Sequence, residues 1–206
     1  EDLSKYIEQE KIGVLYPIYF DSSKLDLPMN ISHITRETYF RLYAPFLLPK
    51  NLDRILFLDA DIICTDNIKD FYNTNFDGNV FVAVENFDID NYKYNQRLKL
   101  PKDNIYINAG VLLINLILYR KLISPQYLNR FIKDNYNILT YQDQDVINKL
   151  FNNYIKIADS KYNYQINMVI GKIQPHCIVH YSCPKKPWHD TYDKPQLAFD
   201  LYQLLE

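Results

Sequence analysis

The stretch from Arg54 to Asp61 constrains the fold of this chain more than any other. Four apolar residues, 55–58, run without a break and are followed at once by Asp59 and Asp61. A continuous apolar run predicts a strand buried on both faces, as in a parallel sheet. Ligands of such sheets collect at the carboxyl ends of the strands. We therefore expect both carboxylates to stand at a binding edge of the sheet.

These two carboxylates predict a cation, because two unpaired buried carboxylates would be costly and a bend after the strand would turn both toward one ion. The chain has two further Asp-x-Asp pairs, Asp88/Asp90 and Asp143/Asp145. Neither follows a buried strand. The former is typical of a polar loop, and the latter of a helix N-terminus, where carboxylates are favoured.

A second cluster begins at His180, which ends an apolar run and precedes Lys186 and Trp188. A lone histidine is usually structural. Two carboxylates and one imidazole nevertheless suit Mn²⁺, with open positions for diphosphate oxygens. A lysine ammonium near the same phosphates would stabilise the charge of a leaving group.

A zinc site made of Cys177, His180 and Cys183 is the alternative use of this cluster. A spacing of three residues would scatter these side chains over both faces of a strand, and no fourth ligand stands at a standard spacing. The acidic pair is therefore the better partner for His180.

Composition limits the function classes. The chain has 206 residues and a net charge of -2, which favours one globular domain and no nucleic-acid partner. Its 4 glycines form no Gly-rich loop, so metal and side chains would have to neutralise a nucleotide diphosphate. Three cysteines without a regular framework favour a reduced compartment. The longest apolar run, 110–119, is too short to span a bilayer.

Apolar periodicity predicts strands alternating with helices, and hence an α/β fold with a mostly parallel sheet. Pro45 should bend or end the first helix, and the polar stretch 86–104 shows no clear period. Strands are expected over 14–20, 55–58, 80–84, 106–115, 154–158 and 178–181, and helices over 32–47, 66–72, 118–136, 143–151 and 195–205.

Several motifs, in this order, resemble the family 8 retaining glycosyltransferases, which include bacterial lipopolysaccharide galactosyl- and glucosyltransferases and glycogenin. The match runs over 31–188. The motifs are Ser32-His33-Ile34-Thr35, Tyr39-Phe40-Arg41-Leu42, Leu56-Phe57-Leu58-Asp59-Ala60-Asp61, Asn108-Ala109-Gly110, Tyr141-Gln142-Asp143-Gln144-Asp145, His180-Tyr181 and Lys186-Pro187-Trp188.

The resemblance implies a GT-A nucleotide-sugar fold in which 1–206 form one catalytic domain that lacks its first βα elements and is incomplete at its N-terminus. It implies retaining transfer of glucose or galactose from UDP-glucose or UDP-galactose to a saccharide, glycolipid or glycoprotein acceptor, with Mn²⁺, or Mg²⁺ in its place, as cofactor. It also implies a cytoplasmic protein at the inner face of the membrane, without a nucleic-acid partner.

The resemblance further implies roles for individual residues. Asp59, Asp61 and His180 would bind the metal. Gln144 would lie near the anomeric carbon, and Asp143 would act beside it. The residues expected to hold the donor are Arg41, Asp59, Ala60, Asn108, Ala109, Asp143 and Lys186. Because Gln144 is a poor nucleophile, we expect the acceptor to attack from the face that UDP leaves, without a covalent intermediate.

Two alternatives remain at this stage. A haloacid-dehalogenase-type phosphatase also places Asp-x-Asp after a strand, but the residue at Ile63 and the later motifs fit that pattern poorly. The other alternative is a module that binds a sugar or a partner protein without turnover. Cys183, where the resembling family has glycine, and the missing first strand favour it.

Overall fold

Strand β4 (Ile107–Asn115) is the centre of the molecule, and eight of its nine residues are buried. It pairs antiparallel with β1 (Arg54–Leu58) on one side and with β3 (Phe81–Glu85) on the other. Strand β5 (Ile155–Ile157) pairs parallel with β3, so the sheet order is β1-β4-β3-β5. The computed structural model describes residues 3–21, 36–87, 90–166, 176–182, 186–188 and 202–203.

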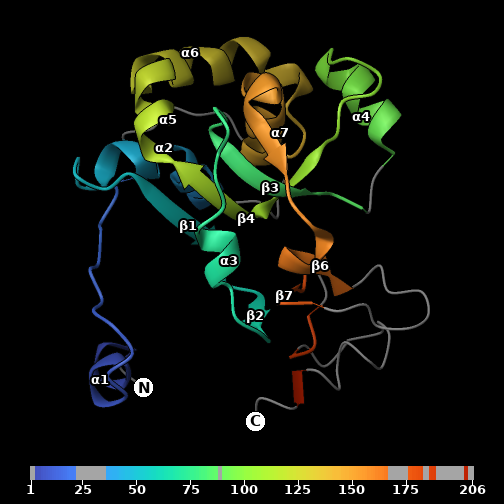
Figure 1. Cartoon of the computed structure of the whole chain (residues 1–206). Helices are drawn as coiled ribbons and strands as arrows, with labels where there is room; N and C mark the ends of the chain where they lie inside the picture. The colour runs from blue at the N-terminus through green and yellow to red at the C-terminus, as the bar shows by residue number, and fades with distance from the viewer. Residues whose placement is uncertain are drawn as a thin grey trace.

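A second, smaller sheet lies beyond the end of the first, next to α3 (Figure 1). Its middle strand β7 (Ile178–His180) pairs antiparallel with β2 (Ile62–Cys64) and parallel with β6 (Tyr164–Gln165). Only three residues, 59–61, separate β1 of the large sheet from β2 of the small one. The two sheets therefore meet at the acidic pair.

Helices cover both faces of the central sheet (Figure 1). In the described part of the chain, none of them has the length and apolar character that crossing a bilayer requires. The helices outside the N-terminal segment are α2 (Phe40–Leu47), preceded by a 3₁₀ turn over Arg36–Tyr39, α3 (Lys69–Tyr72), α4 (Asn91–Leu98), α5 (Leu116–Leu122), α6 (Pro125–Asn135) and α7 (Gln142–Leu150).

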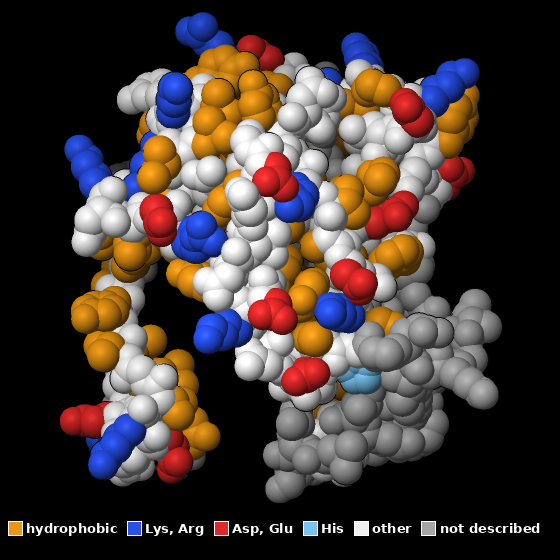
Figure 2. Space-filling view, viewed as in Figure 1, with side chains coloured by type: hydrophobic (Ala, Val, Ile, Leu, Met, Phe, Trp, Pro, Cys, Tyr) orange, Lys and Arg blue, Asp and Glu red, His pale blue; other side chains and the backbone are white. Residues whose placement is uncertain are grey.

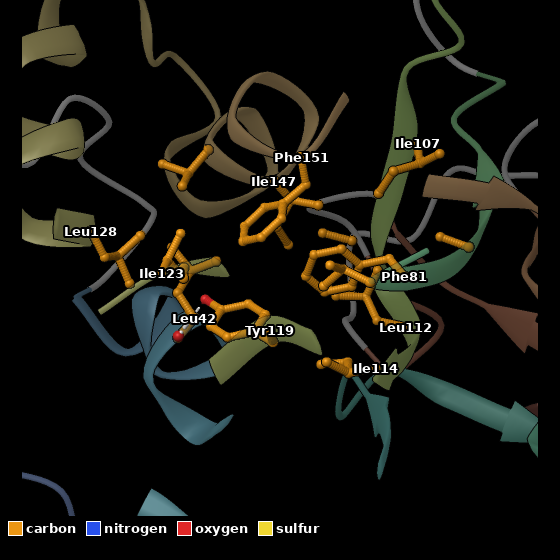
Figure 3. Close-up of a cluster of buried hydrophobic side chains, with 14 of the residues drawn as sticks. Leu42, Phe81, Ile107, Leu112, Ile114, Tyr119, Ile123, Leu128, Ile147 and Phe151 are labelled. Carbon is orange, nitrogen blue, oxygen red and sulfur yellow. Dashed lines mark hydrogen bonds between the residues drawn. The ribbon is translucent and has the colours of Figure 1, made fainter. Parts of the chain in front are cut away.

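The core follows the two-residue period of β4. Leu112 and Ile114 point toward the helices α2, α5, α6 and α7 and pack with Phe81, Tyr119 and Phe151 (Figure 3). Val111 and Leu113 point to the opposite face, where side chains of α3 and β7 cover them. Both faces of β4 are therefore buried, which is why its sequence is apolar without interruption from Ala109 to Ile114.

The α/β fold with a central sheet and flanking helices is confirmed, but the expected mostly parallel pairing is wrong for the described strands. Only the β3–β5 pairing of the central sheet is parallel. The prediction failed because an apolar run reports burial on both faces, and helices on both faces bury an antiparallel strand equally well. Strand β1 is also only half-buried, because it is the edge of the described sheet.

The N-terminal segment does not form the strand expected over 14–20. Helix α1 (Leu3–Gln9) has no buried residue and stands apart from the rest of the described chain (Figure 1). Val14 and Ile18 are exposed, and Figure 2 shows apolar side chains gathered along this segment. Phe20 packs against the rings of Phe40 and Tyr43.

Most of the other expected elements agree with the structure within a few residues, whereas β2, β6 and α1 correspond to no expected element. Pro45 lies inside α2, which ends two residues later. The stretch 86–104 contains α4, which begins after Asp90 accepts a hydrogen bond from the backbone of Lys93 and ends at Lys99 in a left-handed conformation. Most of the helix expected over 195–205 and residues 32–35 lie outside the described residues.

Candidate functional site

Backbone hydrogen bonds hold the acidic pair between the two sheets. The Asp59 amide donates to the Gly110 carbonyl at 2.8 Å, which continues the ladder between β1 and β4. The Tyr181 amide donates to the Asp61 carbonyl at 3.0 Å. In the β2–β7 ladder Ile62 lies opposite His180. The two sheets thus bring residues more than 100 positions apart in the sequence to one point.

One ligand atom each of Asp59, Asp61 and His180 lie within 4.8 Å of one another. The His180 Nε2 atom lies 3.3 Å from Asp61 Oδ1 and 3.9 Å from Asp59 Oδ2. The imidazole is buried, and Asp61 Oδ1 is a buried oxygen without a hydrogen bond. Two carboxylates and an imidazole nitrogen with such an unsatisfied oxygen suit a divalent ion such as Mn²⁺.

Arg41, on α2, joins the acidic pair to the third Asp-x-Asp pair. Its guanidinium donates to Asp59 Oδ1 at 2.9 Å and to the Ala109 carbonyl at 2.5 Å, and its Nε lies 2.8 Å from Asp143 Oδ2. It also stacks over the ring of Phe57 at 4.5 Å. Arg41 is therefore not a solvated surface arginine, since its side chain is only 10% exposed.

The environment moves the pKa values of two carboxyls in opposite directions. Burial raises the pKa of Asp143 to about 6, helped by the charge of Asp59 and opposed by that of Arg41. Burial also acts to raise the pKa of Asp61, but its neighbours His180 and Lys186 outweigh burial and lower that pKa to about 2. Asp61 is thus ionised at any physiological pH and is ready to bind a cation.

Lys186 reaches the site from the segment after β7. Its ammonium donates to Asp61 Oδ2 at 2.5 Å and to the Tyr181 carbonyl at 2.5 Å. Asp61 therefore offers one oxygen to a lysine and keeps the other toward His180. A cationic side chain beside a candidate metal ion is the arrangement expected for binding a diphosphate.

Gln144 and the start of β4 meet on the other side of Arg41. The Gln144 side chain accepts from the Ala109 amide at 2.9 Å and donates to the Tyr106 hydroxyl at 3.3 Å. Asn108 is buried, and Ala60 is exposed at the bend between the sheets. The structure thus gathers the predicted residues of the acidic pair, of β4 and of the start of α7 around Arg41 and His180.

The two carboxylates of the third Asp-x-Asp pair, Asp143 and Asp145, have different surroundings. Asp145 is fully buried, binds both terminal nitrogens of Arg97, and accepts from the Tyr106 hydroxyl and the Tyr141 amide. Its contact with Tyr141, the residue that caps α7, agrees with the helix-start interpretation. Asp143 instead points to Arg41 and the site. Periodicity alone gives both carboxylates the same helix-start interpretation, whereas the family resemblance assigned a site role to Asp143 and none to Asp145.

Two expectations concern residues only partly described. Of the second Asp-x-Asp pair, Asp90 caps α4, while Asp88 lies outside the described residues. Cys183 also lies outside them. Within the described residues the group suited to a metal joins His180 to the acidic pair, and Cys177 is buried away from it as a free thiol.

Sequence reasoning missed Gly110 and Asn163. Gly110 lies against the His180 imidazole, and Asn163 Oδ1 lies 2.9 Å from His180 Nδ1. Gly110 belongs to the Asn108-Ala109-Gly110 motif, but nothing in that motif indicates a contact with His180. Asn163 stands in a polar stretch without a pattern, so only the three-dimensional contact identifies it.

Comparisons with known proteins identify the family of the chain. The model of glycosyl transferase family 8 matches residues 2–192. The lipopolysaccharide 1,3-galactosyltransferase of Salmonella typhimurium is 30% identical over 182 residues, which are 82% of this chain and 54% of that protein. The lipopolysaccharide 1,2-glucosyltransferase of Escherichia coli is 29% identical over 97% of this chain and 62% of its own length.

Solved structures show the same fold. The galactosyltransferase LgtC, crystallised with donor and acceptor sugar analogs, superimposes with a TM-score of 0.74 and 27% identity over 87% of this chain and 68% of that one. An active-site mutant of LgtC gives a TM-score of 0.78 and 25% identity over 90% of this chain and 72% of that one. The chain spans only 54% to 62% of the length of the two curated relatives above.

Proposed function

Since the chain belongs to glycosyl transferase family 8, we propose that its site transfers glucose or galactose from UDP-glucose or UDP-galactose to a hydroxyl of a saccharide, glycolipid or glycoprotein acceptor, with retained configuration. The observation that carries this proposal is the meeting of Asp59, Asp61 and His180 within 4.8 Å. Membership of family 8 removes the phosphatase alternative. The names of two relatives, a lipopolysaccharide galactosyltransferase and a lipopolysaccharide glucosyltransferase, support a saccharide acceptor of the lipopolysaccharide class. We further propose that the protein acts in the cytoplasm at the inner face of the membrane.

In this proposal Asp59, Asp61 and His180 hold Mn²⁺, or Mg²⁺ in its place. A bound divalent ion would neutralise the negative charge of the departing diphosphate. Asp61 suits this task because its carboxylate keeps a low pKa, of about 2, even though it is partly buried. His180 suits it because the imidazole is buried and its Nε2 faces both carboxylates.

The donor would lie along the line from Lys186 to Arg41. The ammonium of Lys186 stands beside Asp61 and would stabilise the diphosphate, while Ala60 at the exposed bend would contact the nucleoside. Arg41, Asn108, Ala109 and Asp143 would position the donor sugar. Ion pairs hold Arg41 in place before any donor binds.

The side chains near the proposed anomeric carbon favour attack by the acceptor from the face that UDP leaves. Gln144 is an amide whose side-chain atoms both engage protein partners, and Asp143 is paired with Arg41 at 2.8 Å. Neither is a free nucleophile in this geometry. In the proposed step the acceptor oxygen bonds to the anomeric carbon, the bond to UDP breaks, and the acceptor proton passes to a UDP oxygen.

A donor panel tests the proposal. UDP release is measured from UDP-glucose, UDP-galactose and UDP-N-acetylglucosamine, with Mn²⁺ and with a chelator, in the presence of saccharide acceptors. We expect UDP to be released from either UDP-glucose or UDP-galactose only when the metal is present. The Asp61→Ala variant should release no UDP. Binding of UDP in a thermal-shift assay without any turnover would identify an inert binding module instead.

A further inference from the structure

Asn163 occupies a fully buried position between β4 and His180. Its side-chain nitrogen donates to Asn108 Oδ1 at 2.9 Å, and its side-chain oxygen lies 2.9 Å from His180 Nδ1. The amide therefore links the interior of the central sheet to the imidazole of the candidate metal site. It touches His180 on the side away from the two aspartates.

One backbone group determines the donor and the acceptor of each hydrogen bond in the series that runs from Gly110 through Asn108 and Asn163 to His180. The Gly110 amide can only donate, and it lies 2.9 Å from Asn108 Oδ1, so that atom must be the oxygen. Asn163 must then present its NH₂ group to the same oxygen. Its carbonyl oxygen is left facing His180 Nδ1, and an oxygen without a proton requires the proton to be on Nδ1.

We propose that Asn163 is a positioning residue that keeps the proton of His180 on Nδ1 and so leaves Nε2 free as a metal ligand. The proposal rests on the proposed function, in which His180 binds the metal. A metal-ligating histidine commonly donates its other ring N–H to an oxygen, which sets its tautomer and orientation. Here a buried amide would supply that oxygen, oriented in turn by Asn108 and by the backbone of β4.

This assignment also explains why the site calls for a cation. With the proton on Nδ1, the lone pair of Nε2 faces Asp61 Oδ1 at 3.3 Å and Asp59 Oδ2 at 3.9 Å. Three acceptors then converge without a donor among them, and Asp61 Oδ1 has no hydrogen bond. A positive charge at the point of convergence satisfies all three atoms.

The tautomer can be observed directly. Protein labelled with ¹⁵N-histidine contains four histidines, and the His180→Gln variant identifies the resonances of His180. In the wild-type chain we expect a proton on Nδ1, both without metal and with Mg²⁺. A proton on Nε2 alone would overturn the proposal.

Two substitutions of Asn163 distinguish the effect of its side-chain oxygen from the effect of its side-chain volume. Asn163→Ala should lose the proton on Nδ1 and weaken Mn²⁺ binding about 10- to 100-fold. Asn163→Asp keeps an oxygen for Nδ1 but removes the NH₂ group that donates to Asn108, so it should keep the proton on Nδ1 and bind Mn²⁺ more tightly than Asn163→Ala. Asn95→Ala is the matched control, because Asn95 is also fully buried and bonded to two backbone carbonyls, yet it has no contact with His180.

The outcomes separate this inference from the proposed function. If the wild-type chain binds no Mn²⁺, the metal site fails, while the ¹⁵N spectrum still tests the tautomer. If the wild-type chain binds Mn²⁺ and Asn163→Ala binds it equally well with the proton still on Nδ1, the positioning role is overturned. If Asn95→Ala weakens Mn²⁺ binding as much as Asn163→Ala, the effect is a loss of stability and the positioning role is again overturned.

Discussion

The backbone of Gly110 lies directly against the imidazole of His180. A Cβ atom at Gly110 would stand 2.2 Å from His180 Cε1 and 2.9 Å from both His180 Nδ1 and Asp59 Oδ2. Such approaches are shorter than any van der Waals contact between carbon, nitrogen and oxygen. A glycine in the middle of a fully buried strand therefore makes room for two of the three candidate metal ligands.

Gly110→Ala should consequently displace His180 and reduce the affinity for Mn²⁺ by at least about tenfold, as expected when a ligand loses its orientation. Titration with Mn²⁺ followed by electron paramagnetic resonance measures this affinity. Gly13→Ala is the matched control, since nothing lies within 4 Å of a Cβ at Gly13. Equal affinities in the two variants would show that His180 is free to shift without loss.

Arg41→Met should raise the pKa of Asp143 above its value of about 6. The guanidinium opposes the effect of burial, and its removal leaves a buried carboxylate without its cation. A larger fraction of the carboxyl is then protonated at neutral pH, whereas in the wild-type chain, with a pKa of about 6, most of it is ionised there. The ¹³C shift of the Asp143 carboxyl against pH measures the change. A midpoint that stays near 6 would show that Arg41 does not control this group.

Asp143→Asn should gain stability relative to wild type as the pH rises. The folded-state pKa of Asp143 is raised to about 6, so its contribution to stability falls as the pH climbs from the unfolded value toward 6. The asparagine does not titrate. From pH 4.5 to 7.5 the unfolding free energy of Asp143→Asn should rise by about 2 kcal/mol relative to that of the wild-type chain. Urea unfolding at both pH values measures it, and a constant difference would contradict the raised pKa.

Asp145→Ala should destabilise the fold by about 3–5 kcal/mol, because it leaves the Arg97 guanidinium and the buried Tyr106 hydroxyl without their partner. Denaturant unfolding at neutral pH measures the loss. The exposed Asp103→Ala serves as control and should change stability by no more than about 0.5 kcal/mol. Similar small effects in both variants would mean that the Arg97 pair contributes little.

The residues that meet at the acidic pair were largely predictable from the sequence, because strand ends and short motifs carry that information. Asp59 and Asp61 follow an apolar run, and His180 ends another. The expected group then needed only that His180 lie beside the acidic pair. Strand β2, which follows Asp61 directly, pairs with β7 and brings His180 there.

What the sequence could not predict depends on contacts between distant segments. The direction of β4 relative to its neighbours leaves no trace in an apolar run that is buried on both faces. Helix α4 was missed because its exposed face is polar and only Asn95 and Leu98 are buried. Asn163 had no signal at all, since its role arises from its contact with His180.

Binding of UDP to the wild-type chain and to Asp61→Ala, with Mn²⁺ and with a chelator, tests the central claim most directly. The claim is that Asp59, Asp61 and His180 share one divalent ion next to the nucleotide. Isothermal titration calorimetry should show wild-type binding that requires Mn²⁺ and is absent from Asp61→Ala, while the fold of the variant persists by circular dichroism. Mn²⁺-dependent UDP binding that is unchanged in Asp61→Ala would contradict it.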